Sequence, residues 1–424
     1  MKSFKQFLNE SKVAHLAHVE DGILLDGPMG VTIIVNFLSS LIDMLSGVKN
    51  EDNEIILKHF ALDFHYELLD EAIQVGLKWD GAPGLTAGID PVTKKFFVGT
   101  KSVFAKKNPK INFTNRDIMK NHSGQGALPD KLKLALKLFP KIWKKGVFKG
   151  DLMFIKDMVE KETIDGESFI TFRPNNITYA VQADSDIGKQ IAGAKIGIAF
   201  HTKFSGKTIA DMKPSFNVSK KDFNKSKDVW FDDSNLPDVS SALFKSGDAS
   251  KAKKMLSQLK KMSKVTNTAL KKVHAQEKNI IKELIRFNNA NVKTGTKISD
   301  EKKYWDSYVD WLVGEKKSKL KTFNDDKEKD LRDKLARDSK EWNQILKFYS
   351  LTIEIKELII RQLNKVKQVK TFVKTADGFK VVGQEGFVGI SPDGKIIKLV
   401  DRMEFTKNLF TTGKDWDKGE KPKV

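Results

Sequence analysis

The spacing of hydrophobic positions divides the chain into segments of different periodicity. Residues 11–72 predict two helices on either side of a polar loop, Gly47 to Asn53. From residue 73 to about 210, short apolar runs lie between turn residues, which is typical of β-strands. We expect strands at 73–78, 95–98, 150–155, 168–172, 177–181 and 195–200, and a short helix at 184–191 that begins with good N-cap residues.

The pattern changes twice more in the second half of the chain. Residues 211–240 are rich in Ser, Asp and Asn, as in a surface connection, and apolar residues then recur three and four apart up to residue 370, which predicts helices. After residue 370 we expect strands at 371–373, 379–382, 385–390 and 395–400, joined by Asp-Gly hairpin turns. The sequence therefore predicts an α+β fold, in which a helical insertion at 238–370 separates residues 73–237 from residues 371–424 of one β-rich domain.

Composition limits the classes of function. The 424-residue chain has no cysteine, which excludes disulfides, thiol nucleophiles and Cys-based metal sites. The longest apolar stretch, Val31 to Ser46, carries Asn36 and Asp43, so we expect a core helix and no membrane span. The formal net charge is +20, and residues 251–370 alone contain 31 Lys and Arg against 16 Asp and Glu. A polyanionic partner is therefore expected at the helical segment.

The run Lys78-Trp79-Asp80-Gly81 stands at the end of the first predicted strand. A lysine followed, after one spacer, by Asp-Gly can present an amine on a tight turn beside a phosphate, because glycine allows close approach of the backbone. Attack by the amine requires its neutral form, which burial and nearby cations favour. Taken alone, these four residues also fit a solvated lysine that precedes a turn.

Further segments follow Lys78 in a recognisable order. They are Gly99-Thr-Lys101-Ser, Gly150-Asp151-Leu-Met-Phe, Ala199-Phe200-His-Thr-Lys, Glu385-Gly-Phe-Val and Ile397-Lys398-Leu-Val400. Together with Lys78, they resemble the motifs of the covalent nucleotidyltransferase superfamily of polynucleotide ligases, RNA ligases and capping enzymes. The resemblance covers residues 73–210 and 370–402. Lys101, Asp151 and Val400 depart from the family's usual Arg, Glu and second lysine.

The resemblance implies a ligase-type nucleotidyltransferase fold built of ATP-grasp-like antiparallel sheets. It implies that Lys78 becomes nucleotidylated by ATP and that Lys398 offsets charge on the α-phosphate. It also implies that Glu385 and Asp151 bind Mg²⁺, with Mn²⁺ as an alternative. The implied nucleotide-binding residues are Trp79, Asp80, Gly81, Lys101, Asp151, Phe200, Glu385 and Lys398, with Phe200 stacking on the base and Phe172 or Tyr179 as substitutes for it.

The implied activity is ATP-dependent polynucleotide ligation through lysyl-AMP and 5′-adenylated nucleic acid. DNA ligases and capping enzymes usually carry an OB barrel after the last motif. Only 24 residues follow Val400, too few for that barrel, so we expect none and favour RNA over nicked duplex DNA. Use of GTP, or capping or adenylylation of another substrate, stays open. The basic helices are expected to contact nucleic acid through Lys253, Lys254, Lys260, Lys261, Lys264, Lys271 and Lys272.

Residues 1–10, MKSFKQFLNE, resemble the capsid-targeting leader of internal head proteins of tailed bacteriophages. In that family a prohead protease cuts after Glu, here Glu10, although an amphipathic helical turn explains the same residues. The leader implies contacts with the capsid interior and the prohead protease, and a location in the phage virion interior, the host cytoplasm or both. It also suggests a second function, a nucleic-acid-binding virion protein that keeps a ligase-like fold without catalysis.

Overall fold

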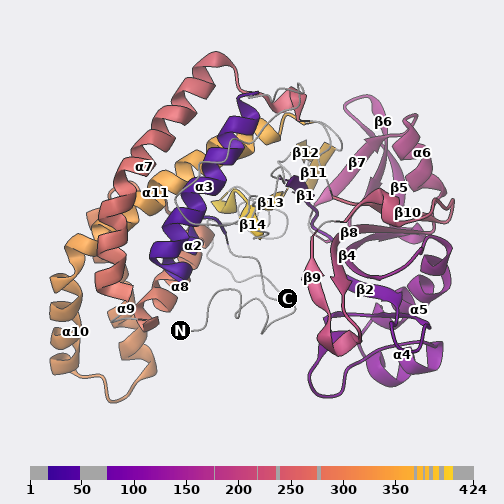
Figure 1. Cartoon of the computed structure of the whole chain (residues 1–424), viewed down its shortest axis with the longest axis horizontal. Helices are drawn as coiled ribbons and strands as arrows, with labels where there is room; N and C mark the ends of the chain where they lie inside the picture. Colours follow the sequence, from indigo (N-terminus) through magenta and orange to yellow (C-terminus); the bar gives the residue numbers. More distant parts are fainter. Residues whose placement is uncertain are drawn as a thin grey trace.

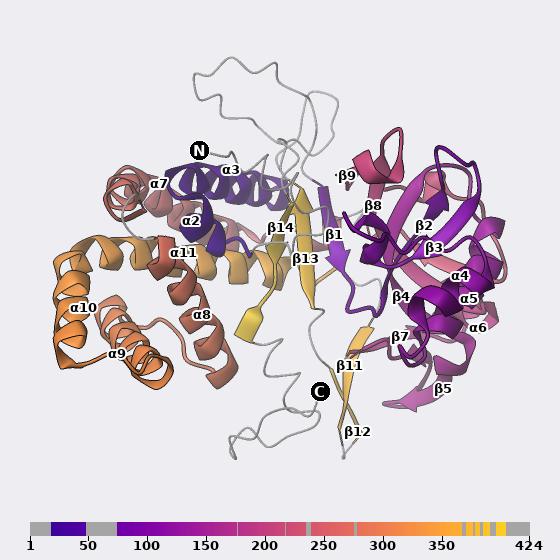
Figure 2. The ribbon, with the colours of Figure 1, turned by 90° about the horizontal axis from the view of Figure 1, so that it is seen from below.

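The computed structural model describes residues 18–47, 74–175, 177–216, 218–234, 239–274, 278–366, 370–375, 378–381, 385–390 and 396–403. Most helices gather on one side of the molecule and most strands on the other, and three strands lie between the two groups (Figures 1 and 2). The α+β class expected from the sequence is confirmed. The predicted leader and its cleavage site at Glu10 lie outside the described residues, as do residues 48–73.

The helical lobe combines the N-terminal helices with those of the central segment. α7 packs against both α3 and α11, because each turns buried apolar residues toward a common core. α3 is long and apolar enough to cross a membrane by length and composition, but Phe37, Leu38 and Leu41 are buried in this core. The helices are α2 (Asp21–Asp26), α3 (Pro28–Leu45), α7 (Ser246–His274), α8 (Lys278–Thr294), α9 (Glu301–Lys319), α10 (Asp325–Arg337) and α11 (Ser339–Leu363).

The largest sheet has six strands in the order β10-β8-β4-β2-β3, with β9 on the edge of β8. Its pairs are antiparallel except for β10, which runs parallel to β8. Helices α4 (Asn115–His122) and α5 (Leu128–Leu138) cover one face, and the sequence pattern did not predict them. The strands are β2 (Gly84–Ile89), β3 (Phe96–Gly99), β4 (Val147–Ile155), β8 (Ile196–Ser205), β9 (Lys213–Ser215) and β10 (Val229–Asp232).

A five-stranded sheet has the order β12-β11-β7-β6-β5, and α6 (Asp186–Gly193) packs on β6 and β7. β7 precedes the helical segment in the sequence and β11 follows it, yet the two strands pair directly. The strands are β5 (Val159–Ile164), β6 (Glu167–Phe172), β7 (Thr178–Gln182), β11 (Lys370–Thr375) and β12 (Gly378–Val381).

The third sheet lies between the helical lobe and the larger sheets (Figure 2). It consists of β1 (Gln74–Lys78), β13 (Gly386–Ile390) and β14 (Ile396–Leu399), all antiparallel. α3 covers one face so closely that a Cβ on Gly389 would lie 2.4 Å from the ring of Phe37. Because side chains alternate along a strand, the neighbouring row of residues faces away from α3.

Candidate active site

Lys78 and Lys398 lie on the face of the small sheet that α3 does not cover. Lys78 is opposite Gly386 of β13. Two residues further along β13, Val388 is opposite Lys398 of β14. Opposite residues point to the same face of a sheet, so the two lysines share that face. Burial lowers the pKa of Lys398, and the charge of Lys78 lowers it further, although Glu385 opposes both effects.

Glu385 immediately precedes β13 and lies beside Lys78, with which it forms an ion pair. Its other carboxylate oxygen, Oε2, is buried and has no hydrogen-bond partner among the described residues. Burial raises the pKa of Glu385, and Lys78 opposes that rise. The next residue, Gly386, has a φ of 150°, and a Cβ there would lie 2.4 Å from the carbonyl oxygen of Leu399. Glycine is therefore required for β13 to approach β14 at this point.

The turn after Lys78 is fixed to the start of β7 by Asp80. The backbone N–H of Asp80 donates a hydrogen bond to the hydroxyl of Tyr179 (2.7 Å). Its carboxylate accepts hydrogen bonds from the side-chain amide of Asn175 (2.9 Å) and the backbone N–H of Ile177 (3.3 Å). Burial raises the pKa of Tyr179 well above its usual value, so the hydroxyl stays protonated. These contacts hold the end of β1, and with it Lys78, in a defined place.

Gly81 brings the same turn against β4 of the six-stranded sheet. A Cβ on Gly81 would lie 2.6 Å from the Cβ of Asp151 and 2.9 Å from the sulfur of Met153. The adjacent backbone N–H of Ala82 donates a hydrogen bond to the carbonyl of Leu152 (3.0 Å). This close approach places Asp151 beside Lys78, so the two sheets contribute to one site.

Asp151 has a basic environment. The Nε2 atom of His201 lies 3.7 Å from its carboxylate. Burial by itself would raise the pKa of Asp151, but His201, Lys149 and Lys78 outweigh this effect and lower the pKa overall. The carboxylate is therefore ionised at neutral pH and is available to accept hydrogen bonds or to bind a cation.

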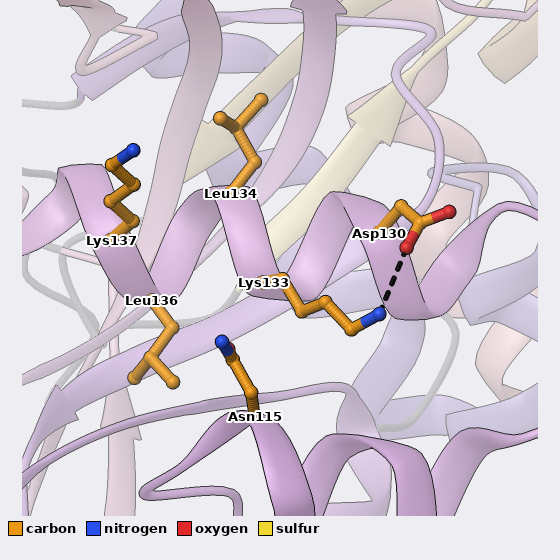
Figure 3. A pocket seen from close by; sticks show the side chains of 6 residues that line it. All are labelled: Asn115, Asp130, Lys133, Leu134, Leu136 and Lys137. Carbon is orange, nitrogen blue, oxygen red and sulfur yellow. Dashed lines mark hydrogen bonds and ion pairs between the residues drawn. The ribbon is translucent and has the colours of Figure 1, made fainter.

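A surface pocket of about 540 Å³ lies elsewhere, over α4 and α5 (Figure 3). An ion pair between Lys133 and Asp130 (3.1 Å) crosses its lining. The pocket contains none of the candidate site residues, so it contributes nothing to the assignment of the site. It is lined by Asn115, Asp130, Lys133, Leu134, Leu136 and Lys137.

Comparison with known proteins identifies a family. Residues 57–414 match DUF6267, a family of unknown function, and this match spans most of the chain. The chain belongs to the DUF6267 family. No curated protein and no solved structure matches it. The function of this DUF6267 protein must therefore be argued from the geometry of its own residues.

Four residues singled out from the sequence converge in this DUF6267 protein: Lys78, Glu385 and Lys398 on the small sheet, and Asp151 across the turn. Lys101 begins the short 3₁₀ helix η1 (Lys101–Phe104) that follows β3, and it is exposed. It lies close enough to Lys149 to lower the pKa of that residue.

Two aromatic residues do not have the predicted role in nucleotide binding. Phe200 is fully buried and stacks on Phe223, with ring centroids 4.3 Å apart, on the face that α4 and α5 cover. Trp79 is 6% exposed and packs between Tyr179 and Trp230. Neither ring offers a free face to a base, so both predictions are corrected. The proposed substitutes, Phe172 and Tyr179, are equally buried in the core.

The sequence missed His201, the residue that follows Phe200 on β8. Because side chains alternate along a strand, His201 points away from the face covered by α4 and α5 and toward Asp151. The alternation is readable from the sequence. The sequence does not tell which of the two residues, Phe200 or His201, faces the site, because the helices that cover the other face were not predicted.

Four basic residues of α7 form an exposed stripe. Lys253, Lys260, Lys264 and Lys271 recur at helical spacing on a side of α7 away from the buried residues Leu259 and Leu270, and we call these four the α7 stripe. Lys254 and Lys261 lie beside them and are also exposed. Lys272 differs, because it forms ion pairs with Glu341 (2.8 Å) and Asp338 (3.6 Å). These intramolecular pairs compete with the nucleic-acid contact predicted for Lys272, which stays a prediction.

Metal ligands are sparse. Within the described ranges, no group of three or more His, Asp or Glu side chains is arranged to hold a metal ion. Mg²⁺ needs fewer protein ligands when it is bound with a nucleotide, because waters and phosphate oxygens complete its shell around one or two carboxylates. The unpartnered Oε2 of Glu385 and the ionised carboxylate of Asp151 fit that requirement.

A buried ionic cluster lies behind Lys398. The backbone carbonyl of Lys398 accepts a hydrogen bond from Val19 (3.2 Å), just before α2. The next residue, Glu20, pairs with Lys356 of α11 at 2.8 Å and lies 3.6 Å from Arg402. Burial would raise the pKa of Glu20, but the nearby positive charges outweigh this and lower it to about 2. The cluster thus ties the helical lobe to the strand that carries Lys398.

Proposed function

We propose that this protein is an ATP-dependent polynucleotide ligase with a ligase-type nucleotidyltransferase fold and a covalent lysyl-AMP intermediate on Lys78. One observation carries the proposal. Lys78 and Glu385 are about 300 residues apart in the sequence, yet they form an ion pair beside Lys398. An incidental surface lysine needs neither a glycine-dependent carboxylate partner nor a second lysine on the same sheet face.

The proposed reaction has three steps. The lone pair of Lys78 Nζ forms a bond to the α-phosphorus of ATP, the bond to the bridging oxygen breaks, pyrophosphate leaves and the amine loses a proton. A 5′-phosphate oxygen of the nucleic acid then displaces the lysine, which regains a proton as the P–N bond breaks. Finally a 3′-hydroxyl oxygen, losing its proton, attacks the activated 5′-phosphorus, and AMP leaves.

The surrounding residues have distinct roles in this scheme. Glu385 must release Lys78 before attack, because an ion pair favours the charged form of the amine and attack needs the neutral form. Lys398 places positive charge where charge develops on the α-phosphate. Glu385 and Asp151 would hold Mg²⁺, or Mn²⁺ in its place, which supplies positive charge to the phosphate oxygens.

The nucleic acid is proposed to lie along the α7 stripe. Lysines without neighbouring aromatic residues attract the phosphate backbone and do not stack on bases. In the described part of the chain, helices accompany the sheets and no closed barrel does. The resemblance associates that arrangement with RNA ligases, so RNA is proposed as the preferred substrate over nicked duplex DNA.

Labelling with α-phosphate-labelled ATP and Mg²⁺ tests the central step. Wild-type protein should acquire one AMP on Lys78, detectable by mass spectrometry of the peptide. Lys78→Ala and Lys78→Arg should acquire none, and the Arg variant keeps a cation beside Glu385, which separates loss of the nucleophile from loss of the ion pair. Lys145→Ala, at an exposed lysine, should label like the wild type. Equal labelling of all four proteins would refute the assignment of Lys78.

Substrate identity is then tested by supplying nucleotides and acceptors separately. Replacement of ATP by GTP would show which base is used. Joining of 5′-phosphorylated single-stranded RNA faster than a nicked DNA duplex would support the RNA preference, and the reverse order would contradict it. Transfer of the nucleotide without joining would indicate capping or adenylylation instead.

A second candidate function is a nucleic-acid-binding virion protein without catalysis. It is favoured by the ion pair that engages the amine of Lys78 and by the burial of every aromatic residue proposed to stack on the base. Absence of any AMP adduct, together with salt-sensitive nucleic-acid binding, would support it. Protein from phage particles that begins at Ser11 would support the leader and a virion location, whereas an intact Met1 would exclude cleavage.

A further inference from the structure

Gly84 creates space between two charged residues of the neighbouring strand. It is opposite Asp151 in the pairing of β2 with β4. A Cβ on Gly84 would lie 3.3 Å from Oδ1 of Asp151 and 3.6 Å from Cε of Lys149. Both side chains therefore extend over the same glycine, on the sheet face opposite α4 and α5.

Two lysines approach this place from neighbouring strands: Lys149 on β4, and Lys101 two residues beyond Gly99 of β3, which is opposite Thr86. Neither lysine forms an ion pair within the described ranges, in contrast to Lys78, which is paired with Glu385. Asp151 supplies one negative charge beside these two lysines, so positive charge exceeds negative charge in this partly buried place.

The floor of the same place holds a polar group without a partner. Thr86 is directly opposite Lys149 and is fully buried. Its hydroxyl has no hydrogen-bond partner in the part of the chain that the structure describes. A buried hydroxyl without a partner is destabilising, and most buried polar groups in proteins have a hydrogen-bond partner. Two lysines and one hydroxyl without a partner therefore lie around Gly84, next to Asp151.

We infer that Lys101 and Lys149, above Gly84 and Thr86, form a subsite for a phosphate group other than the one that Lys78 attacks. The natural ligand of this subsite depends on the proposed function, which it deepens. The phosphate belongs either to the diphosphate part of the nucleotide or to the 5′ end of the nucleic acid. In both cases the negative charge binds the two ammonium groups, and Asp151 beside them accepts a hydroxyl of the same ligand.

Calorimetric titration with tripolyphosphate tests the subsite directly. Lys149→Met and Lys101→Met should each bind about tenfold more weakly than wild type, as expected for loss of one charge-assisted hydrogen bond. Lys145→Met removes the same charge at an exposed site and should bind within about twofold of wild type. Equal affinity in all proteins, or an equal loss in Lys145→Met, would overturn the inference, because the +20 chain would then attract anions without a defined site.

Thermal unfolding without ligand separates binding from a structural role. Because Lys149 is partly buried and forms no ion pair within the described ranges, Lys149→Met should have a Tm no lower than wild type. A clearly lower Tm together with weaker binding would show that Lys149 supports the fold instead, and would also overturn the inference.

Two oligonucleotides distinguish the sources of the phosphate. The test compares an RNA oligonucleotide that has a 5′-phosphate with the same oligonucleotide that has a 5′-hydroxyl. If the subsite binds the nucleic-acid end, wild type should bind the two with different affinity, whereas Lys149→Met should bind them equally. If only tripolyphosphate binding changes, the subsite binds the nucleotide's diphosphate. If phosphate binding depends on Lys149 but the protein never forms lysyl-AMP, the subsite is upheld and the ligase proposal is refuted. If lysyl-AMP forms but phosphate binding does not depend on Lys149, the ligase proposal is upheld and the subsite is refuted.

Discussion

Substitution of Lys356 by Met would remove the charge closest to Glu20 while keeping an unbranched side chain of similar length. Both side chains are almost completely buried, with exposed fractions of 2% and 1%. Loss of one partner from a buried ion pair costs about 3–5 kcal/mol, because the remaining charge is left without compensation. Arg402 stays 3.6 Å from Glu20, so we expect about 3 kcal/mol. That is a large part of the 5–15 kcal/mol that stabilises an ordinary domain.

Urea denaturation at pH 7 measures this loss as a lower midpoint at an unchanged slope. Its pH dependence provides a second test. The pKa of Glu20 is lowered from 4.5 to about 2 in the folded protein, so its stabilising contribution is complete above pH 4.5 and is lost as the pH falls toward 2. The wild type should therefore weaken over that range. The variant should weaken less, because its Glu20 protonates more readily.

The double variant Lys356→Met, Glu20→Gln is the control for an unpaired charge. It should recover part of the lost stability, since no buried carboxylate remains. The reasoning would be refuted if the single variant had a free energy of unfolding within about 0.5 kcal/mol of wild type at pH 7. It would also be refuted if the double variant were no more stable than the single one. Because Val19 bonds to the carbonyl of Lys398, the single variant should also slow AMP transfer to Lys78 in the protein that remains folded.

Three further substitutions test other parts of the structure. Gly386→Ala should cost about 1–3 kcal/mol of stability from backbone strain alone and should reduce AMP labelling. Gly247→Ala, at a position with open space around it, should leave AMP labelling unchanged. Equal effects of the two substitutions on labelling would contradict the close approach of β13 to β14. Phe200→Ala should lower the free energy of unfolding measured with urea by about 3–5 kcal/mol and leave the KM for ATP of the folded fraction unchanged. A raised KM without lost stability would instead support the prediction that Phe200 stacks on the base. Reversing the charge of three lysines of the α7 stripe should reduce the slope of the logarithm of the nucleic-acid binding constant against log salt by about 2–3. Lys272→Met, which breaks an intramolecular ion pair, should reduce that slope by less than 1. Identical slopes for the two variants would exclude the α7 stripe as the binding surface.

Local periodicity was enough to predict most elements. The strand that ends at Lys78, the strands after residue 370 and the helices between them appear where apolar spacing placed them. Helices α4 and α5 were not predicted, because they lie within a region dominated by strands. Without them, the sequence could not show which face of β8 is covered. That single omission explains both the incorrect choice of Phe200 and the failure to find His201.

Long-range contacts were the other part that the sequence could not supply. The lysines of α7 are exposed as helical spacing predicts, yet Lys272 is paired with residues from the start of α11 and the position before it. Trp79 looked available beside a reactive lysine, but its burial depends on Tyr179 and Trp230 from two other sheets. Spacing along one element determines which residues face outward, whereas contacts between elements decide which of them remain available.

The pairing of β1 with β13 has a consequence for the time at which the site can exist. Lys78 and Glu385 are about 300 residues apart in the sequence, and chains grow at about 5–20 residues per second. A ribosome therefore releases the lysine roughly 15–60 seconds before its carboxylate partner. During that interval β1 lacks its neighbour, and the helical lobe is made before the small sheet can close. A nascent chain thus carries Lys78 without the rest of the candidate site, so the proposed nucleotide chemistry cannot begin until residues 386–399 have emerged.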